Sequence, residues 1–201
     1  MRELLRSTAG ERLGLAAYDA DFAEAVDSVD GPILRTERIQ TLREPGNPAW
    51  EAFTDGRWDD ALRIAAEPDP ESARFFAQLD KAGSALRRLR IVERPLTPYV
   101  IWELHALRHR AEAGERIRVL GADRLVGFEQ RHGRIPELMV LGSQVLYEVM
   151  YDPSGTPVGA RKLIEPGVVR ACRVQIESLL EEAEPLDSYF RHEVAGRKPG
   201  P

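Results

Sequence analysis

The stretch LMVLGSQVLYEVMYDPSGTPVGARKLI, residues 138–164, decides the fold class. Leu138–Leu141 is apolar throughout, which is typical of a central strand covered on both faces. A Gly-Ser turn then leads to a second strand at Val145–Met150, because glycine adopts the backbone conformation that a tight hairpin requires. After the turn signal DPSG, Val158–Ile164 can add a third strand. The stretch therefore predicts antiparallel strands within one sheet.

Helices are predicted on both sides of this stretch. Pro166–Ala183 and Pro98–Ala113 carry apolar residues at helical spacing. Ile33–Leu42 alternates like an edge strand, and Leu86–Val92 alternates like a half-exposed strand with its arginines on the open face. We expect an α+β fold with N-terminal helices, a mixed and mainly antiparallel sheet of about four to six strands, and a C-terminal helix packed on the sheet.

The length and composition indicate one globular domain. Of the 201 residues, 43% are hydrophobic and 30% are charged. We divide the chain into an N-terminal helical extension (1–30), a single α+β domain (31–195) and a flexible tail (196–201). The charged first residues lack the apolar run of a secretory signal, and no run of about 20 apolar residues occurs. We expect a cytoplasmic protein without membrane contact.

Charge is distributed unevenly along the chain. The formal net charge is −5 at pH 7, yet residues 85–134 carry +5 and residues 1–84 carry −7. We interpret the central positive segment as a basic face that pairs with acidic segments of the same chain. Direct nucleic-acid binding is therefore not expected.

The sequence contains none of the common catalytic motifs. It has no glycine-rich phosphate loop, no dinucleotide fingerprint and no nucleophile elbow. The single cysteine, Cys172, excludes an internal disulfide and falls on the apolar stripe of a helix, where a thiol is inert. His105 and His109 have the spacing to share a metal ion, but the pattern offers no third ligand. We assign no catalytic or metal-binding residue, expect no cofactor, and favour a protein that is not an enzyme.

The helix Pro98–Ala113 has bulky side chains on the side opposite its core stripe. Either a second layer of the chain covers these rings, or a partner or ligand does. Arg90 and Arg94 come from the strand just before this helix, so an arginine can lie near Glu103 and the Tyr99 hydroxyl, as a structural ion pair or as a site for a small anion. The candidate ligand- or partner-binding residues are Arg90, Arg94, Tyr99, Trp102, Glu103, His105 and His109.

From about Leu34 to Phe190 the chain resembles a family of actinobacterial domains of unknown function. The resemblance implies a small soluble protein commonly encoded beside helix-turn-helix regulators, and it transfers no functional residue. The segments that carry it are Pro45–Phe53, Asp60–Leu62, Arg88–Tyr99, Trp102–Leu104, Ala113–Arg118, Leu146–Asp152 and Pro185–Tyr189.

Three functional hypotheses follow from the sequence, of which direct nucleic-acid binding through the central positive segment is the least favoured. The first is a non-catalytic regulatory domain linked to transcriptional regulation through a protein partner, with a helix-turn-helix regulator as the candidate. The alternative is a domain or enzyme that binds a small anionic metabolite in the neighbourhood of Arg90, Arg94, Tyr99 and Glu103. The oligomeric state stays open.

Overall fold

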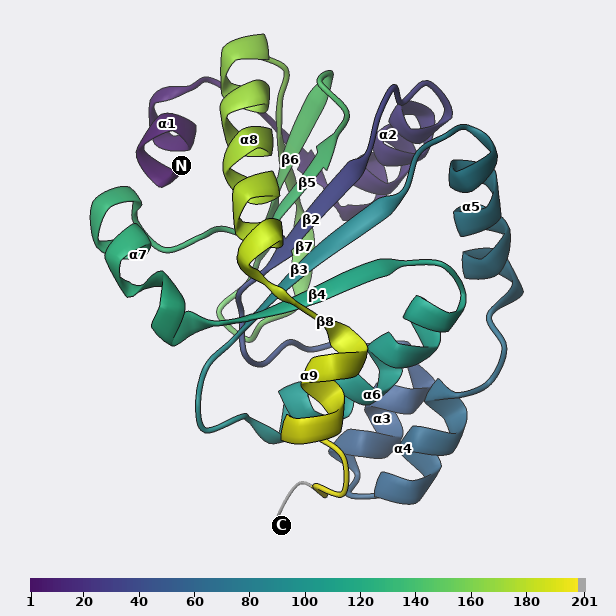
Figure 1. Ribbon diagram of the computed structural model, residues 1–201. Helices are drawn as coiled ribbons and strands as arrows, with labels where there is room; N and C mark the ends of the chain where they lie inside the picture. The colour runs from purple at the N-terminus through teal and green to yellow at the C-terminus, as the bar shows by residue number, and fades with distance from the viewer. Residues whose placement is uncertain (199–201) are drawn as a thin grey trace.

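One mixed sheet organises the part of the chain that the computed structural model describes, residues 1–198. Its strands lie in the order β1-β7-β6-β5-β2-β3-β4-β8 (Figure 1). Neighbours β2, β3 and β4 are parallel, and the remaining neighbouring pairs are antiparallel. The strands are β1 (Glu11–Gly14), β2 (Ile33–Glu37), β3 (Leu86–Val92), β4 (Arg116–Gly121), β5 (Leu138–Leu141), β6 (Val145–Tyr151), β7 (Pro157–Leu163) and β8 (Glu184–Pro185).

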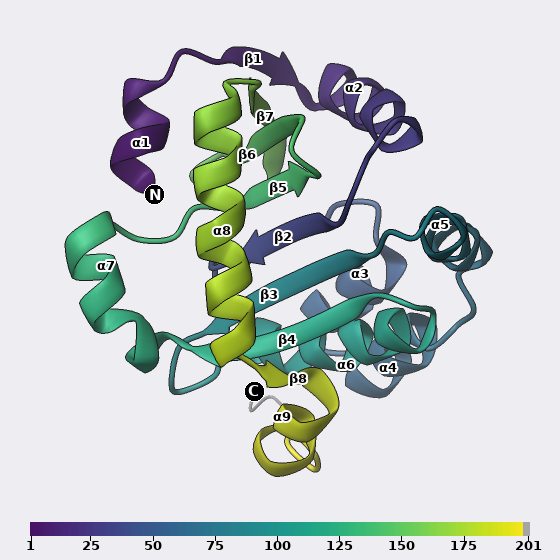
Figure 2. The same ribbon diagram turned by 45° about the horizontal axis from the view of Figure 1, so that its top comes forward.

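Helices connect the parallel strands and cover both faces of the sheet. Parallel neighbours require crossover connections, which α3, α4 and α5 supply between β2 and β3, and α6 supplies between β3 and β4. Figure 2 shows α8 across one face and α3, α4 and α6 on the other. The helices are α1 (Arg2–Ser7), α2 (Leu15–Asp27), α3 (Pro48–Thr54), α4 (Trp58–Ala65), α5 (Pro70–Lys81), α6 (Pro98–Glu112), α7 (Val126–His132), α8 (Pro166–Glu182) and α9 (Leu186–Glu193), with a 3₁₀ turn η1 (Ala122–Leu125).

The face under α8 carries a continuous apolar core. Leu34, Leu89 and Leu120 project from β2, β3 and β4 into this core and meet the stripe of α8 that includes Cys172 and Ile176. The N-terminal α1 contributes to the same core through the buried side chains of Met1 and Leu5. Burial of this kind contributes about 25 cal/mol for each Å² of apolar surface, so this face supplies much of the stability of the fold.

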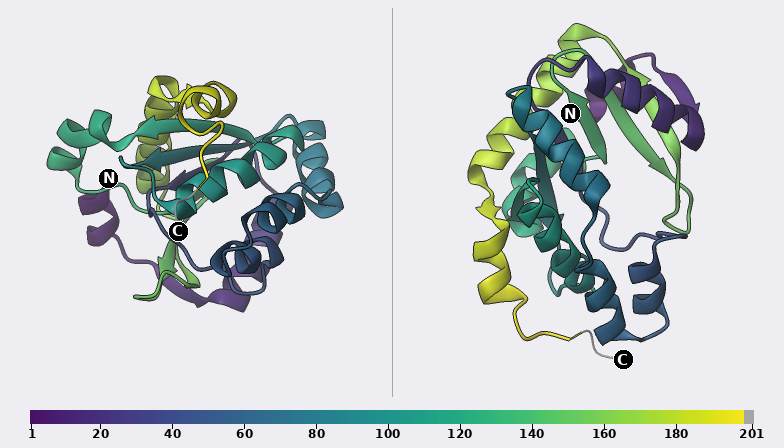
Figure 3. Two further views of the ribbon diagram at one scale, coloured as in Figure 1. Left: turned by 90° about the horizontal axis from the view of Figure 1, so that it is seen from below. Right: turned by 90° about the vertical axis from the view of Figure 1, so that its right-hand side faces the viewer.

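The opposite face is divided into two apolar clusters. One cluster joins α3, α4, α6 and α9 to the ends of β3 and β4, and the other joins α2 and α5 to β5, β6 and β7. The side view in Figure 3 shows the sheet between α8 and these helices. Between the two clusters, β2 and β3 place charged side chains on the sheet: Glu37 is 3% exposed, Arg88 3% and Arg90 0%.

The mainly antiparallel sheet and the helix packed on it are confirmed, but the predicted number of strands was too low. Within residues 1–198 the sheet has eight strands. Two of them are short edge strands that the sequence pattern did not indicate: β1, in the segment expected to be a helical extension, pairs with β7, and β8 pairs with β4.

The two alternating segments also differ from expectation in their surroundings. β2 lies at the centre of the sheet between β5 and β3, and not at an edge. Arg88 and Arg90 of β3 are buried rather than open to water. β2 is central because β3 and β5 each pair with one of its edges. The β3 arginines can be buried because carboxylates from other segments neutralise them inside the protein.

The predicted tail, residues 196–201, lies partly outside the described residues. Of its described part, Lys198 donates a hydrogen bond to Asp59, with 3.1 Å between Nζ and Oδ1. None of the helices described for residues 1–198 combines the length and the apolar character needed to cross a bilayer.

Candidate functional site: a charged cavity on the sheet

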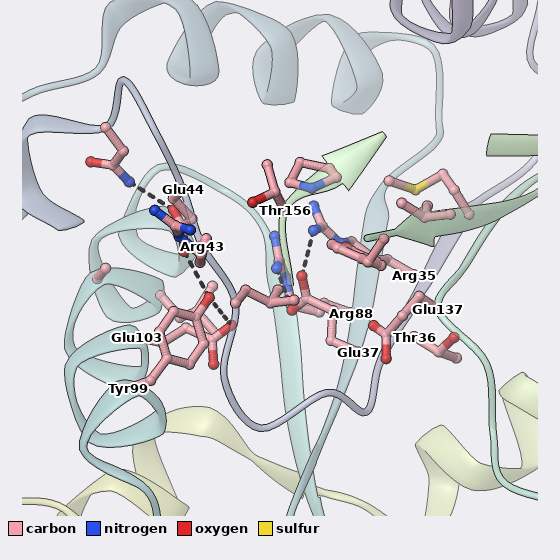
Figure 4. Close-up of a pocket in the computed structure, with 18 of the residues that line it drawn as sticks. Arg35, Thr36, Glu37, Arg43, Glu44, Arg88, Tyr99, Glu103, Glu137 and Thr156 are labelled. Carbon is pink, nitrogen blue, oxygen red and sulfur yellow. Dashed lines mark hydrogen bonds and ion pairs between the residues drawn. The ribbon is translucent and has the colours of Figure 1, made fainter. Parts of the chain in front are cut away.

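A cavity of about 550 Å³ lies on the sheet face opposite α8. Its floor is formed by β2, β3 and β5, and its walls by α6, the start of α2, the segment 42–47 and the β6–β7 hairpin. In Figure 4, Tyr99, Glu103 and Glu44 lie on one side of the view and Arg35 and Glu137 on the other. Further lining residues are Leu15, Tyr18, Thr36, Glu37, Arg43, Arg88, Trp102, Arg110, Met139, Tyr151 and Thr156.

Five charged side chains form an alternating chain at this cavity. Arg88 stands in the middle and donates to Glu37, with 2.5 Å between Nη1 and Oε2, and to Glu115, with 2.5 Å between Nε and Oε1. Glu37 also pairs with Arg35. Glu115 also accepts from Arg110 Nε at 2.6 Å. The chain therefore has an arginine at each end and one positive charge in excess.

The carboxylates of this chain are buried, whereas its two ends are accessible. The side chains of Glu37 and Glu115 are 4% and 0% exposed, against 30% for Arg35 and 36% for Arg110. Burial by itself would raise the pKa of Glu37, but Arg35, Arg88 and nearby Arg90 together hold that pKa well below its usual range. At Glu115, burial would likewise raise the pKa of the carboxyl group, but Arg88 and Arg110 hold that pKa below its usual range. Both carboxylates are thus ionised, and the more accessible members of this chain of charges are the guanidinium groups of Arg35 and Arg110.

A second group of charges links α6 to β3 and to the segment 42–47. Arg90 Nε donates to Glu103 Oε2 at 2.7 Å, and the Tyr99 hydroxyl donates to Glu44 Oε1 at 2.7 Å. Burial raises the pKa of Glu103 against the opposing charge of Arg90. Burial and the two neighbouring carboxylates also raise the pKa of Tyr99. The phenol therefore stays protonated and acts as a hydrogen-bond donor.

Glu137 lines the cavity and, like Glu44, pairs with no arginine within residues 1–198. Its Oε1 accepts from the backbone amides of Arg38 and Ile39, each at 2.8 Å. Its Oε2 is buried and has no partner. Burial and the Glu37 carboxylate raise the pKa of Glu137 to about 7. The described part of the protein thus supplies hydrogen-bond donors to only one oxygen of this buried carboxyl group.

The structure brings four of the seven sequence-predicted site residues together. Tyr99, Trp102 and Glu103 line the cavity, and Arg90 lies directly behind Glu103. These side chains come together because Thr97 caps the N-terminus of α6, accepting from Val100 N at 3.1 Å, and so fixes the start of the helix beside β3.

The other three predicted residues lie elsewhere. Arg94 is exposed and pairs with Glu193 at 2.6 Å. His109 is half-buried and lies 3.1 Å from Glu112. His105 packs edge-on against Trp58 and Phe190, with ring centroids 5.5 and 4.7 Å apart.

The bulky side of α6 is covered by the chain itself. Trp102 is 2% exposed and stacks on Phe53, with ring centroids 5.4 Å apart and an interplanar angle of 17°. Together with the packing of His105 under α4 and α9, this leaves no open aromatic surface on that side of α6 within the described residues. The sequence left open whether the chain itself or a partner covers these side chains. For Trp102 and His105, the chain itself does.

Sequence reasoning missed most of the charged residues at the cavity. The signal that could have found them is the pairing of RTE in β2 with RLR in β3, since the register places Arg35 beside Arg88 and Glu37 beside Arg90. Opposite charges on neighbouring strands stabilise a pair. Only knowledge that β2 and β3 are neighbours turns these two patterns into one site. The missed residues are Arg35, Glu37, Arg88, Arg110, Glu115 and Glu137.

Within residues 1–198, no set of three or more His, Cys, Asp or Glu side chains is arranged to hold a metal ion. Among curated proteins, no sequence matches the chain. Among solved structures, one similar chain is that of TrmBL2, described as an archaeal chromatin protein with a novel mode of DNA binding. The two are 12% identical with a TM-score of 0.44, over 88% of this chain and 52% of the other, so this chain spans about half of that protein's length. A family model, Domain of unknown function (DUF6879), matches residues 20–191, and the protein belongs to that family.

Proposed function

We propose that the protein binds a small anionic molecule in the cavity between α6 and the sheet. The observation that carries this proposal is the alternating chain of charges, in which Glu37, Arg88 and Glu115 are buried and the partly exposed ends, Arg35 and Arg110, are guanidinium groups. A guanidinium that already holds one carboxylate keeps further N–H donors for a second anion. The exposed Arg43 at the mouth adds a third cation.

The cost of burying these charges also supports a binding role. A buried ion pair seldom adds net stability compared with apolar residues of the same size, and charged groups with perturbed pKa values collect at functional sites. The cavity volume suits a small molecule. The partner-binding hypothesis rested on the rings of α6, which the chain itself covers, so the anion-binding alternative is favoured.

Titration calorimetry and thermal shift with glutarate, succinate and inorganic phosphate test the proposal. At about 100 times the dissociation constant a ligand adds about 2.7 kcal/mol to the free energy of unfolding, which raises Tm by about 6–10 °C for a chain of this length. The double variant Arg35→Gln/Arg110→Gln should weaken binding at least about tenfold, because each charge-assisted hydrogen bond contributes about 1.5–3 kcal/mol.

Two further variants separate binding from stability. Arg43→Gln removes a cation whose side chain forms no ion pair within residues 1–198, so it should weaken binding without changing Tm in the absence of ligand. Arg63→Gln changes an exposed arginine that pairs only with side chains of its own helix region, Asp60 and Glu67, and should leave binding unchanged. The proposal is wrong if none of the three anions binds, or if binding survives in the Arg35→Gln/Arg110→Gln and Arg43→Gln variants.

A further inference from the structure

The unpartnered oxygen of Glu137 identifies a second feature of the ligand. Glu137 lines the cavity, is 7% exposed, and leaves Oε2 without a hydrogen-bond donor. A buried acceptor without a partner costs about 1–3 kcal/mol, and more when it is charged. A group that remains unsatisfied at the floor of a cavity is one that a ligand can satisfy.

Within residues 1–198, the neighbouring groups of the protein do not donate to that oxygen. The two amide bonds to Oε1 come from the turn that follows β2, and they fix the orientation of the carboxyl group. Thr36 on the neighbouring strand is already used, because its hydroxyl donates to Pro136 O at 2.7 Å and accepts from Leu138 N at 3.0 Å. The guanidinium groups of Arg35 and Arg88 are held by Glu37.

Two carboxyl groups face each other at this point of the sheet. The antiparallel register pairs Arg35 with Met139 and Thr36 with Leu138, so its next step places Glu37 opposite Glu137. Like charges directly opposite each other on neighbouring strands repel. The two arginines on Glu37 offset part of this repulsion. Two backbone amides and the nearby charge of Arg90 offset part of the charge of Glu137, but no cationic side chain pairs with it within residues 1–198. A positively charged donor placed at Oε2 would stabilise both carboxyl groups.

We infer that the ligand is a small zwitterion, with its acidic group at the arginines and a protonated amine at Glu137 Oε2. Arg35 is two residues from Glu37 on the same face of β2, which corresponds to about 7 Å of strand rise. Figure 4 shows Arg35 and Glu137 on the same side of the cavity. Amino acids with a second acidic group a few bonds from the amine have this spacing. The inference rests on the proposed function and adds the amine to it.

Glutamate and glutarate test the inference because they differ only in the amine. Glutamate should bind to the full chain at least about tenfold more tightly than glutarate, as expected for one charge-assisted hydrogen bond. In Glu137→Gln, which keeps the shape of the side chain, this preference should fall below about threefold while glutarate binds as before. Glu177→Gln, on α8 at the opposite face, should retain the preference.

The possible outcomes separate the inference from the proposed function. If glutarate binds as tightly as glutamate, or if Glu137→Gln keeps the preference, the amine is excluded and anion binding stands. If glycerol or glucose binds as tightly as glutamate and is equally sensitive to Glu137→Gln, the donor is a hydroxyl group and the inference is overturned. If neither glutamate nor glutarate binds, the proposed function and the inference both fail.

Discussion

Arg88 joins Glu37 and Glu115 at the centre of the alternating chain of charges. Its replacement tests how much these buried ion pairs contribute to the stability of the protein. Arg88→Met keeps an unbranched stem of similar shape but removes two charge-assisted hydrogen bonds, to Glu37 and Glu115. Each such bond contributes about 1.5–3 kcal/mol, and breaking a buried pair costs about 3–5 kcal/mol. Because Arg35 and Arg110 still hold the two carboxylates, we expect a loss of about 3–4 kcal/mol.

Urea unfolding followed by circular dichroism measures this loss. With a slope of about 2–3 kcal/mol per molar urea, the midpoint should fall by about 1–2 M. Arg87→Met is the matched control, because Arg87 neighbours Arg88 on β3 but projects to the opposite face and is only half-buried. Its effect should stay below about 1 kcal/mol.

The effect of Arg88→Met should also depend on pH. The pKa values of Glu37 and Glu115 are lowered in the folded protein, so their ionised forms add stability above the pKa of an unfolded glutamate. This stabilisation is lost as the pH falls through the pKa values that Glu37 and Glu115 have in the folded protein. In the variant the pKa values of Glu37 and Glu115 rise, because each buried carboxylate keeps only one of its two arginine partners, and protonation then removes part of the cost of burying them. The difference from the wild type should be largest near about pH 7.5 and smaller near about pH 4.5. A loss below about 1 kcal/mol, or a loss independent of pH, would refute this account of the charged chain.

Three further predictions concern the elements around the cavity. Asn47→Ala should lower the free energy of unfolding by about 1 kcal/mol in urea titration, because Asn47 Oδ1 caps α3 by accepting from Ala49 N at 3.0 Å; an unchanged midpoint would contradict the cap. Gly159→Ala should weaken the pairing of β1 with β7, since a Cβ there would lie 2.0 Å from Leu13 O at a φ of +135°. Amide exchange should become faster in β1 and β7 alone; an equal increase throughout the protein would contradict this prediction. Cys172 should resist thiol reagents in the native state, because burial raises its pKa to about 11; labelling that is equally fast in native and urea-unfolded protein would exclude this.

Local patterns in the sequence were sufficient for several elements near the cavity. The pair Asn47-Pro48 is a local signal for the start of a helix, and Asn47 does cap α3. Thr97-Pro98 is the same kind of signal, and Thr97 caps α6. The apolar stripe through Cys172 predicted the buried face of α8. Caps and periodicity act over a few residues, so they can be read without knowledge of the fold.

The sequence by itself thus determined the fold class, the main helices and the antiparallel hairpin of β5 and β6. Only the tertiary structure decided that β2 is central, that Arg88 and Arg90 are buried, and that Trp102 is covered by Phe53. The partners of Arg88 lie 27 and 51 residues away along the chain. An alternating strand shows that one face is polar, but whether water or a remote carboxylate meets that face depends on which strands become neighbours, and that is a property of the whole fold.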